Sequence, residues 1–132
     1  MSQSTVKMDK DSAALQKKLQ NELEQYQSGQ KDFNKLVQQR QILEGQMNEN
    51  KCVLDELNLL GAENTVYKLF GPVLVKQDLE DSRQNVGKRM EYIKKELNRC
   101  NDTLETLEKK QAKHRENLQK LQQQYQVAVA MK

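Results

Sequence analysis

The stretch GAENTVYKLFGPVLVK, from Gly61 to Lys76, decides the fold because it interrupts two long helical patterns. Its first part, Thr65–Phe70, is rich in β-branched and aromatic residues, and Val73–Val75 resumes an apolar run after the turn-forming pair Gly71-Pro72. A plain connection between helices usually takes about two to eight residues. These sixteen residues therefore need structure of their own, and we predict a β-hairpin over 61–76.

Both flanks show the heptad pattern of a coiled coil, with seam positions at alternating steps of four and three residues. The first seam is Leu15, Leu19, Glu22, Tyr26, Gly29, Phe33, Leu36, Arg40, Leu43, Met47, Asn50, Leu54 and Leu57. The second seam is Val86, Met90, Ile93, Leu97, Cys100, Leu104, Leu107, Gln111, His114, Leu118, Leu121, Tyr125 and Ala128. We predict an all-α dominated fold: a long antiparallel coiled-coil hairpin with one central β-hairpin.

As a single domain over 1–132, the chain is expected to have a flexible N-terminus over 1–11, a first helix over about 12–60 and a second helix over 77–129. A hairpin placed symmetrically between the helices pairs residues whose numbers sum to about 140, although sums of 133 or 147 would preserve the same type of pairing. The favoured register sets Gly29 opposite Gln111 and Tyr26 opposite His114. We expect a locally weakened layer there, since Gly in a helix interior costs about 1 kcal/mol relative to Ala.

The predicted hairpin is apolar on both faces. In the first strand Tyr67 and Leu69 alternate with Val66 and Phe70, and the second strand is equally apolar. One face can rest on the base of the coil, but the other face and both strand edges have nothing in this chain to cover them. An isolated two-stranded hairpin is marginal in water, and open edges invite pairing. We therefore predict oligomerisation through strand addition.

Composition and motifs argue against an enzyme. Only 36% of the residues are hydrophobic, tryptophan is absent, and the sequence has no P-loop, CxxC, GxGxxG or GxSxG motif. No signal peptide or membrane-length apolar run is present, so we expect a soluble, cytosolic protein without cofactor, bound metal, membrane or nucleic acid. Cys52 and Cys100 fall too far apart in the predicted register to form a disulfide.

Two segments have alternative interpretations. The basic run Lys109, Lys110, Lys113 and Arg115 suits either a nucleic acid or acidic partner, or an ordinary solvated coil surface, which its neighbouring Glu residues favour. The coil end carries Met and small aliphatic residues outside the seam, which fit either a frayed terminus or an adaptable apolar contact surface.

Three segments resemble the beta class of prefoldin: VYKLFGPVLVKQ from Val66 to Gln77, NVGKR from Asn85 to Arg89, and Glu91–Ile93. The resemblance extends over about 15–125. It implies a cytosolic heterohexamer of two alpha-class and four beta-class subunits, whose hairpins join into an oligomeric β-barrel platform. It also implies an ATP-independent chaperone that binds unfolded clients such as actin and tubulin and passes them to the group II chaperonin.

The resemblance assigns two sets of residues. The expected assembly residues of the hairpin are Val66, Tyr67, Leu69, Phe70, Val73, Leu74 and Val75. The expected client-binding residues of the coil tip are Met8, Ala13, Ala14, Leu15, Leu19, Tyr125, Val127, Val129 and Met131. A structural coiled-coil scaffold and a nucleic-acid-binding helical arm are the two rival interpretations.

Overall fold

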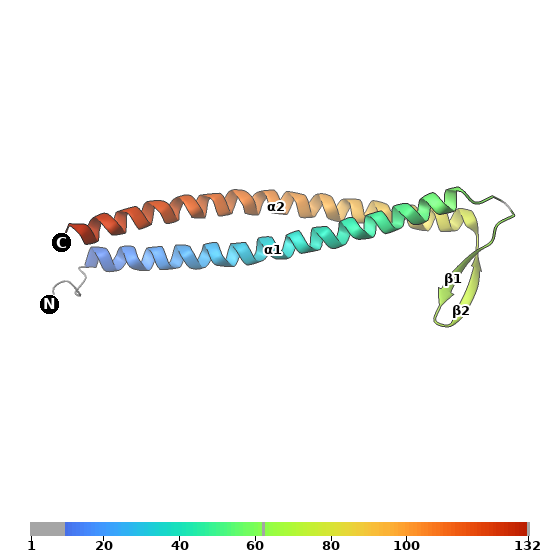
Figure 1. Ribbon diagram of the computed structural model, residues 1–132, viewed down its shortest axis with the longest axis horizontal. Coiled ribbons are helices and arrows are strands. Elements are labelled where there is room, and N and C mark those ends of the chain that lie inside the picture. Colours follow the sequence, from blue (N-terminus) through green and yellow to red (C-terminus); the bar gives the residue numbers. More distant parts are fainter. Residues whose placement is uncertain (1–9, 62, 132) are drawn as a thin grey trace. The chain divides into compact units, whose positions relative to one another are not determined.

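The computed structural model describes residues 10–61 and 63–131. It contains α1 (Lys10–Asn58), β1 (Val66–Phe70), β2 (Val73–Gln77) and α2 (Leu79–Ala130), in that order (Figure 1). The predicted fold class is confirmed, because two long helices flank one antiparallel β-hairpin. The expected flexible N-terminus lies outside the described residues except for its last two positions, which already belong to α1.

Contacts divide the chain into two compact units, each made from both helices. The terminal unit combines Met1–Val37 with Thr103–Lys132, and the central unit is Gln38–Asp102 with the hairpin. Within each unit a segment of α1 lies beside an antiparallel segment of α2 (Figure 1).

The seam between the helices follows the predicted heptads. All thirteen predicted positions of each helix are buried or half-buried, whereas most residues between them are exposed. The buried apolar side chains of the described residues are Leu43, Leu57, Val86, Ile93, Cys100 and Leu104. Burying one Val, Leu or Ile side chain stabilises a fold by about 1.5–3 kcal/mol, so this narrow seam is the main apolar core of the coil.

The contacts of each unit agree with the predicted register. In the terminal unit the Gln111 side chain lies against Gly29, a pair whose numbers sum to 140. In the central unit Arg83 reaches the carbonyls of Leu57 and Leu60, pairs whose numbers sum to 140 and 143. The exposed Ile42 and Tyr92 occupy positions outside the seam, as the heptads require.

The hairpin turns tightly at Gly71-Pro72. Phe70 pairs with Val73 across a two-residue loop, and Gly71 has a φ of 57°. Positive φ at the first loop position followed by proline, whose φ is fixed near about −65°, matches a type II′ turn, which suits the twist of a hairpin. Glycine is the residue that adopts this conformation without a steric cost.

Capping groups fix where the helices stop and start. The predicted first helix, 12–60, is observed as α1 over 10–58, because the chain tightens after Asn58 into turns that end at Leu60. Arg83 of α2 donates hydrogen bonds to the carbonyls of Leu57 and Leu60, at 3.0 and 3.3 Å, and so caps the end of α1.

The second helix begins later than predicted. Strand β2 extends to Gln77, and α2 starts at Leu79 instead of residue 77. The reason is Asp78, whose carboxylate accepts a hydrogen bond of 3.3 Å from the backbone N–H of Glu80. An aspartate in this N-cap position satisfies one of the free amides of a helix start.

Candidate interaction surfaces

One face of the hairpin is open and is apolar except for Lys76, which pairs with Tyr67. Leu69 pairs directly with Leu74, and Tyr67 lies on the same face two residues before Leu69. Their exposed fractions are 57% for Tyr67, 65% for Leu69 and 63% for Leu74. Side chains of this type normally lie in a protein interior or an interface, so this face lacks a cover within the chain.

The opposite face is covered only at its base. Val66 and Gln77 are half-buried, and a small hollow of about 150 Å³ separates them from Leu57 and Val86 of the coil. Further along the same face, Phe70, Val73 and Val75 are exposed. The Lys68 ammonium lies 5.0 Å from the centre of the Phe70 ring, a weak cation–π contact that leaves the outer part of this face apolar.

Both outer edges of the hairpin are open. The sheet has two strands, β1 and β2, and no third strand pairs with either among the described residues. Six of the seven predicted assembly residues are exposed, the exception being the half-buried Val66. The hairpin thus offers two apolar faces and two rows of free backbone groups in one element.

The coil tip brings together only part of the predicted client-binding set. Ala13, Ala14, Val127, Val129 and Met131 are exposed, and Val127 and Met131 line an open groove of about 490 Å³. Three further predicted residues, Leu15, Leu19 and Tyr125, are half-buried in the seam. Met8 lies outside the described residues.

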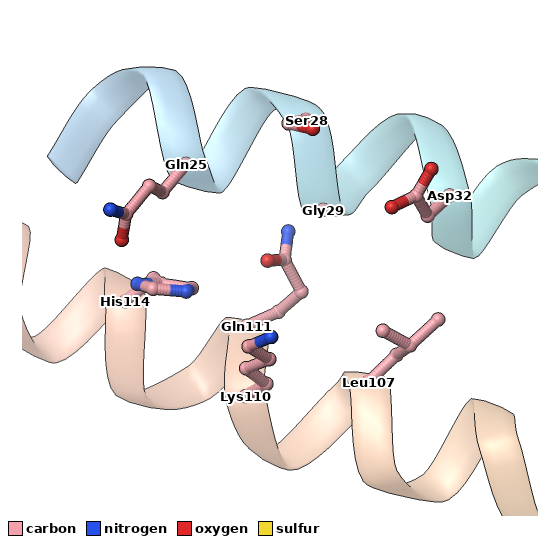
Figure 2. Close-up of a pocket in the computed structure, with 8 residues that line it drawn as sticks. All are labelled: Gln25, Ser28, Gly29, Asp32, Leu107, Lys110, Gln111 and His114. Atoms are coloured by element: carbon pink, nitrogen blue, oxygen red, sulfur yellow. The ribbon is translucent and has the colours of Figure 1, made fainter. Parts of the chain in front are cut away.

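A polar layer crosses the seam of the terminal unit. Gln111 is buried, and its side-chain amide donates a hydrogen bond of 2.9 Å to the carbonyl of Tyr26. Figure 2 shows Gln111 reaching from α2 towards α1 at Gly29. A Cβ atom on Gly29 would lie 2.2 Å from the Gln111 Oε1 atom, so the space for this amide exists only because residue 29 is glycine.

The histidine in this layer has a different partner from the one its heptad position predicts. His114 contacts the Glu22 carboxylate, which lies one turn away from Tyr26 on α1 and also accepts a hydrogen bond of 3.4 Å from Asn117. Direct polar contacts therefore join the helices here. The expected local weakening of this layer stays a prediction, because these contacts do not report its stability.

Three other kinds of feature concern metal binding, membrane insertion and disulfide formation. No group of three or more His, Cys, Asp or Glu side chains in the described part of the chain is placed to hold a metal ion. None of the described helices is long and apolar enough to cross a membrane. Cys52 is exposed and Cys100 is buried, with no disulfide between them.

These features define a class: coiled-coil hairpin proteins with an uncovered β-hairpin at the helix connection. A model of the prefoldin subunit family matches residues 20–125 of the chain. The chain therefore belongs to the prefoldin subunit family.

Three similar proteins indicate which type of subunit the chain resembles. The chain is 68% identical over 124 residues to a probable prefoldin subunit 6 of Drosophila melanogaster, covering 94% of this chain and 99% of the relative. It is 50% identical to human prefoldin subunit 6, covering 89% of this chain and 92% of that one. The prefoldin beta subunit crystal structure from Thermococcus strain KS-1 matches with a TM-score of 0.58 at 29% identity, covering 85% and 92% of the two chains.

The predicted resemblance to a beta-class prefoldin subunit, most like subunit 6, is thus confirmed. Prefoldin-family proteins are chaperones and not enzymes. The chain accordingly has the role of a chaperone subunit in a prefoldin complex, with other prefoldin subunits as its partners.

Proposed function

We propose that this chain is a beta-type subunit of an ATP-independent chaperone hexamer in the cytoplasm. Its hairpin joins a β-barrel made with alpha- and beta-class subunits, and its coil tip binds unfolded polypeptides of the actin and tubulin class. The complex then delivers these clients to the group II chaperonin. The observation that carries the proposal is the hairpin, which is apolar on both faces and unpaired on both edges.

The hairpin supports assembly through two kinds of interaction. Its free edges provide backbone donors and acceptors for a neighbouring strand, as in other cases of strand addition. Its exposed Leu69 and Leu74 provide apolar area on the face that such a barrel would enclose. A coiled-coil scaffold without partner subunits would leave this surface in water.

The tip supports client binding by the chemistry of its exposed side chains. Val127 and Met131 offer a shallow apolar groove, and Met131 is 82% exposed. Methionine is flexible and polarisable, which lets it adapt to many partner shapes. Such a surface suits clients that share exposed apolar segments but no common sequence.

The assembly role is tested by introducing charge on the open hairpin face. In Tyr67→Asp/Leu69→Asp, two carboxylates would have to be buried between strands, so we expect loss of the complex when the chain is mixed with its partner subunits. Leu59→Asp is the control, because Leu59 is 85% exposed and lies outside the hairpin. Native mass spectrometry measures assembly, and circular dichroism should show unchanged helicity in both variants. A complete complex with the double variant would refute the role of this face.

The tip is tested in the assembled complex by its ability to suppress aggregation of a denatured protein. We expect Val127→Gln/Met131→Gln and removal of residues 1–14 and 126–132 each to weaken suppression several-fold while assembly is unchanged. Leu59→Gln serves as the matched control for loss of an exposed apolar side chain. Intact suppression after the truncation would show that the tip is not the binding surface.

A further inference from the structure

The terminal unit contains a groove beside its polar layer. Beside Gly29 the helices leave a hollow of about 360 Å³, which Gln111 and His114 help to line (Figure 2). Its lining comes from both helices and is mostly polar: Gln25, Ser28 and Asp32 of α1 and Lys110 of α2, with Leu107 as an apolar member.

Lysines gather on the side of the coil where this groove opens. Lys113 follows Lys110 by one helical turn, Lys35 follows Asp32 by one turn, and Lys18 precedes Gln25 by two turns. All four lysines are exposed, and no carboxylate of the described chain lies within ion-pair distance of Lys110 or Lys113. Asp32 is the one acidic side chain on the groove rim.

The opposite side of the seam has a different charge. A smaller hollow there is lined by Glu108 and Arg115, so a negative and a positive group offset each other. Lys109 pairs with Glu105 at 3.4 Å. The basic run seen in the sequence is therefore not one patch. Lys110 lines the groove, and helical spacing places Lys113, Lys18 and Lys35 beside it on the same side of the coil.

We propose that this groove, together with the lysines that flank it, binds an extended acidic segment of an unfolded client polypeptide, an inference that rests on the proposed chaperone function and specifies which client segments the coil binds. The ammonium groups attract carboxylates from positions along both helices. The amide of Gln25 and the hydroxyl of Ser28 can hydrogen-bond to the backbone of an extended chain. Lys18 and Lys35 are about 25 Å apart along the helix axis, which is the length of seven or eight extended residues.

A polypeptide fits this groove better than a nucleic acid. Both kinds of ligand carry negative charge, which the lysines attract and Asp32 repels, so the distinction comes from the other groups of the groove. Binding of single strands also relies on exposed aromatic rings for base stacking, whereas Tyr26 and Phe33 are seam residues that border the hollow on the opposite side. Mixed lysine, amide and hydroxyl groups match the alternating carboxylates and peptide groups of an acidic chain.

The test measures binding of a fluorescein-labelled twelve-residue peptide of alternating Glu and Ser to the reconstituted complex, by fluorescence anisotropy at low salt. We expect Lys110→Glu/Lys113→Glu to lower affinity for this peptide at least tenfold. Lys17→Glu/Lys31→Glu has the same change in net charge on the outer surface of α1, away from the groove, and should lower affinity less than twofold. A peptide with Gln in place of Glu should not bind.

Two results would overturn the inference. Equal losses of affinity in the two variants would mean that general charge attraction explains the binding. Unchanged affinity in the Lys110/Lys113 variant would show that the peptide does not bind in the groove. Oligo(dT) of the same charge provides a further comparison. If it binds more tightly than the peptide and loses affinity in the Lys110/Lys113 variant, the groove binds nucleic acid and the inference is overturned. Assembly and suppression of aggregation, measured in parallel, report on the proposed function separately. Normal assembly and suppression without peptide binding would reject the proposed binding in the groove but not the chaperone function.

Discussion

Gly29 and Gly45 are both interior glycines of α1, yet their surroundings are opposite. A Cβ atom on Gly45 would meet nothing within 4 Å, whereas one on Gly29 would overlap the buried Gln111 amide. The same substitution at these two positions therefore separates helix propensity from packing. It also shows how a single missing side chain can admit a polar group into an apolar seam.

We expect Gly45→Ala to stabilise the chain by about 0.5–1 kcal/mol, because Ala has the higher helix propensity. Gly29→Ala gains the same propensity but forces Gln111 out of its hydrogen bond with Tyr26, which costs about 1–3 kcal/mol for a buried group. It should therefore be less stable than Gly45→Ala by about that amount in urea unfolding followed by circular dichroism.

The Gln111→Ala background provides the control for this comparison. With the amide removed, Gly29→Ala should regain the stabilisation seen for Gly45→Ala, giving a coupling energy between residues 29 and 111 of about 1–3 kcal/mol. Additive effects of the two substitutions would contradict the proposed role of Gly29 as the space for Gln111.

At the scale of elements, Arg83 connects the end of α1 to the start of α2. Its guanidinium hydrogen-bonds to two carbonyls at the α1 terminus and pairs with Glu80 at 3.3 Å. A cation at a helix C-terminus also interacts favourably with the helix dipole. These contacts join the end of α1 to the start of α2.

Replacing this side chain should destabilise the chain. We expect Arg83→Met to lower the free energy of unfolding by about 1–3 kcal/mol, because it leaves the α1 carbonyls without their capping donors. Arg99→Met is the control: the Arg99 side chain is 76% exposed beside Glu96, and exposed ion pairs contribute little, about 0–1 kcal/mol. Similar thermal unfolding midpoints for the two variants would show that Arg83 is not a significant cap.

The elements were predictable to different degrees for physical reasons. Heptad spacing identifies the seam because it depends only on helix geometry, and Gly71-Pro72 identifies the turn because few residue pairs adopt it. The helix bounds depend on Asp78 and Arg83, and the second of these acts on residues more than twenty positions away. Sequence spacing does not reveal such a contact.

The polar layer was the least predictable part of the seam. Heptad positions place Gly29 and Gln111 in one layer, but they do not show that the amide fills the glycine gap or that His114 selects Glu22. These outcomes depend on side-chain conformation and on which acceptor lies within reach. The grouping of lysines beside the groove was equally difficult to predict, because these lysines come from two helices that are far apart in sequence.

At the scale of the whole molecule, the central claim is that partner subunits cover the hairpin. The chain alone leaves Leu69 and Leu74 exposed and the outer backbone groups of β1 and β2 unpaired among the described residues. Amides in such open edges exchange with solvent quickly, whereas amides in a closed barrel are paired with a neighbouring strand and exchange slowly.

Hydrogen–deuterium exchange of residues 64–78, measured on the isolated chain and on the assembled complex, tests this claim most directly. We predict rapid exchange at the outward-facing amides of β1 and β2 in the isolated chain and strong protection in the complex, with little change at the seam around Ile93. Formation of the complete complex without new protection in the hairpin would contradict assembly through this element.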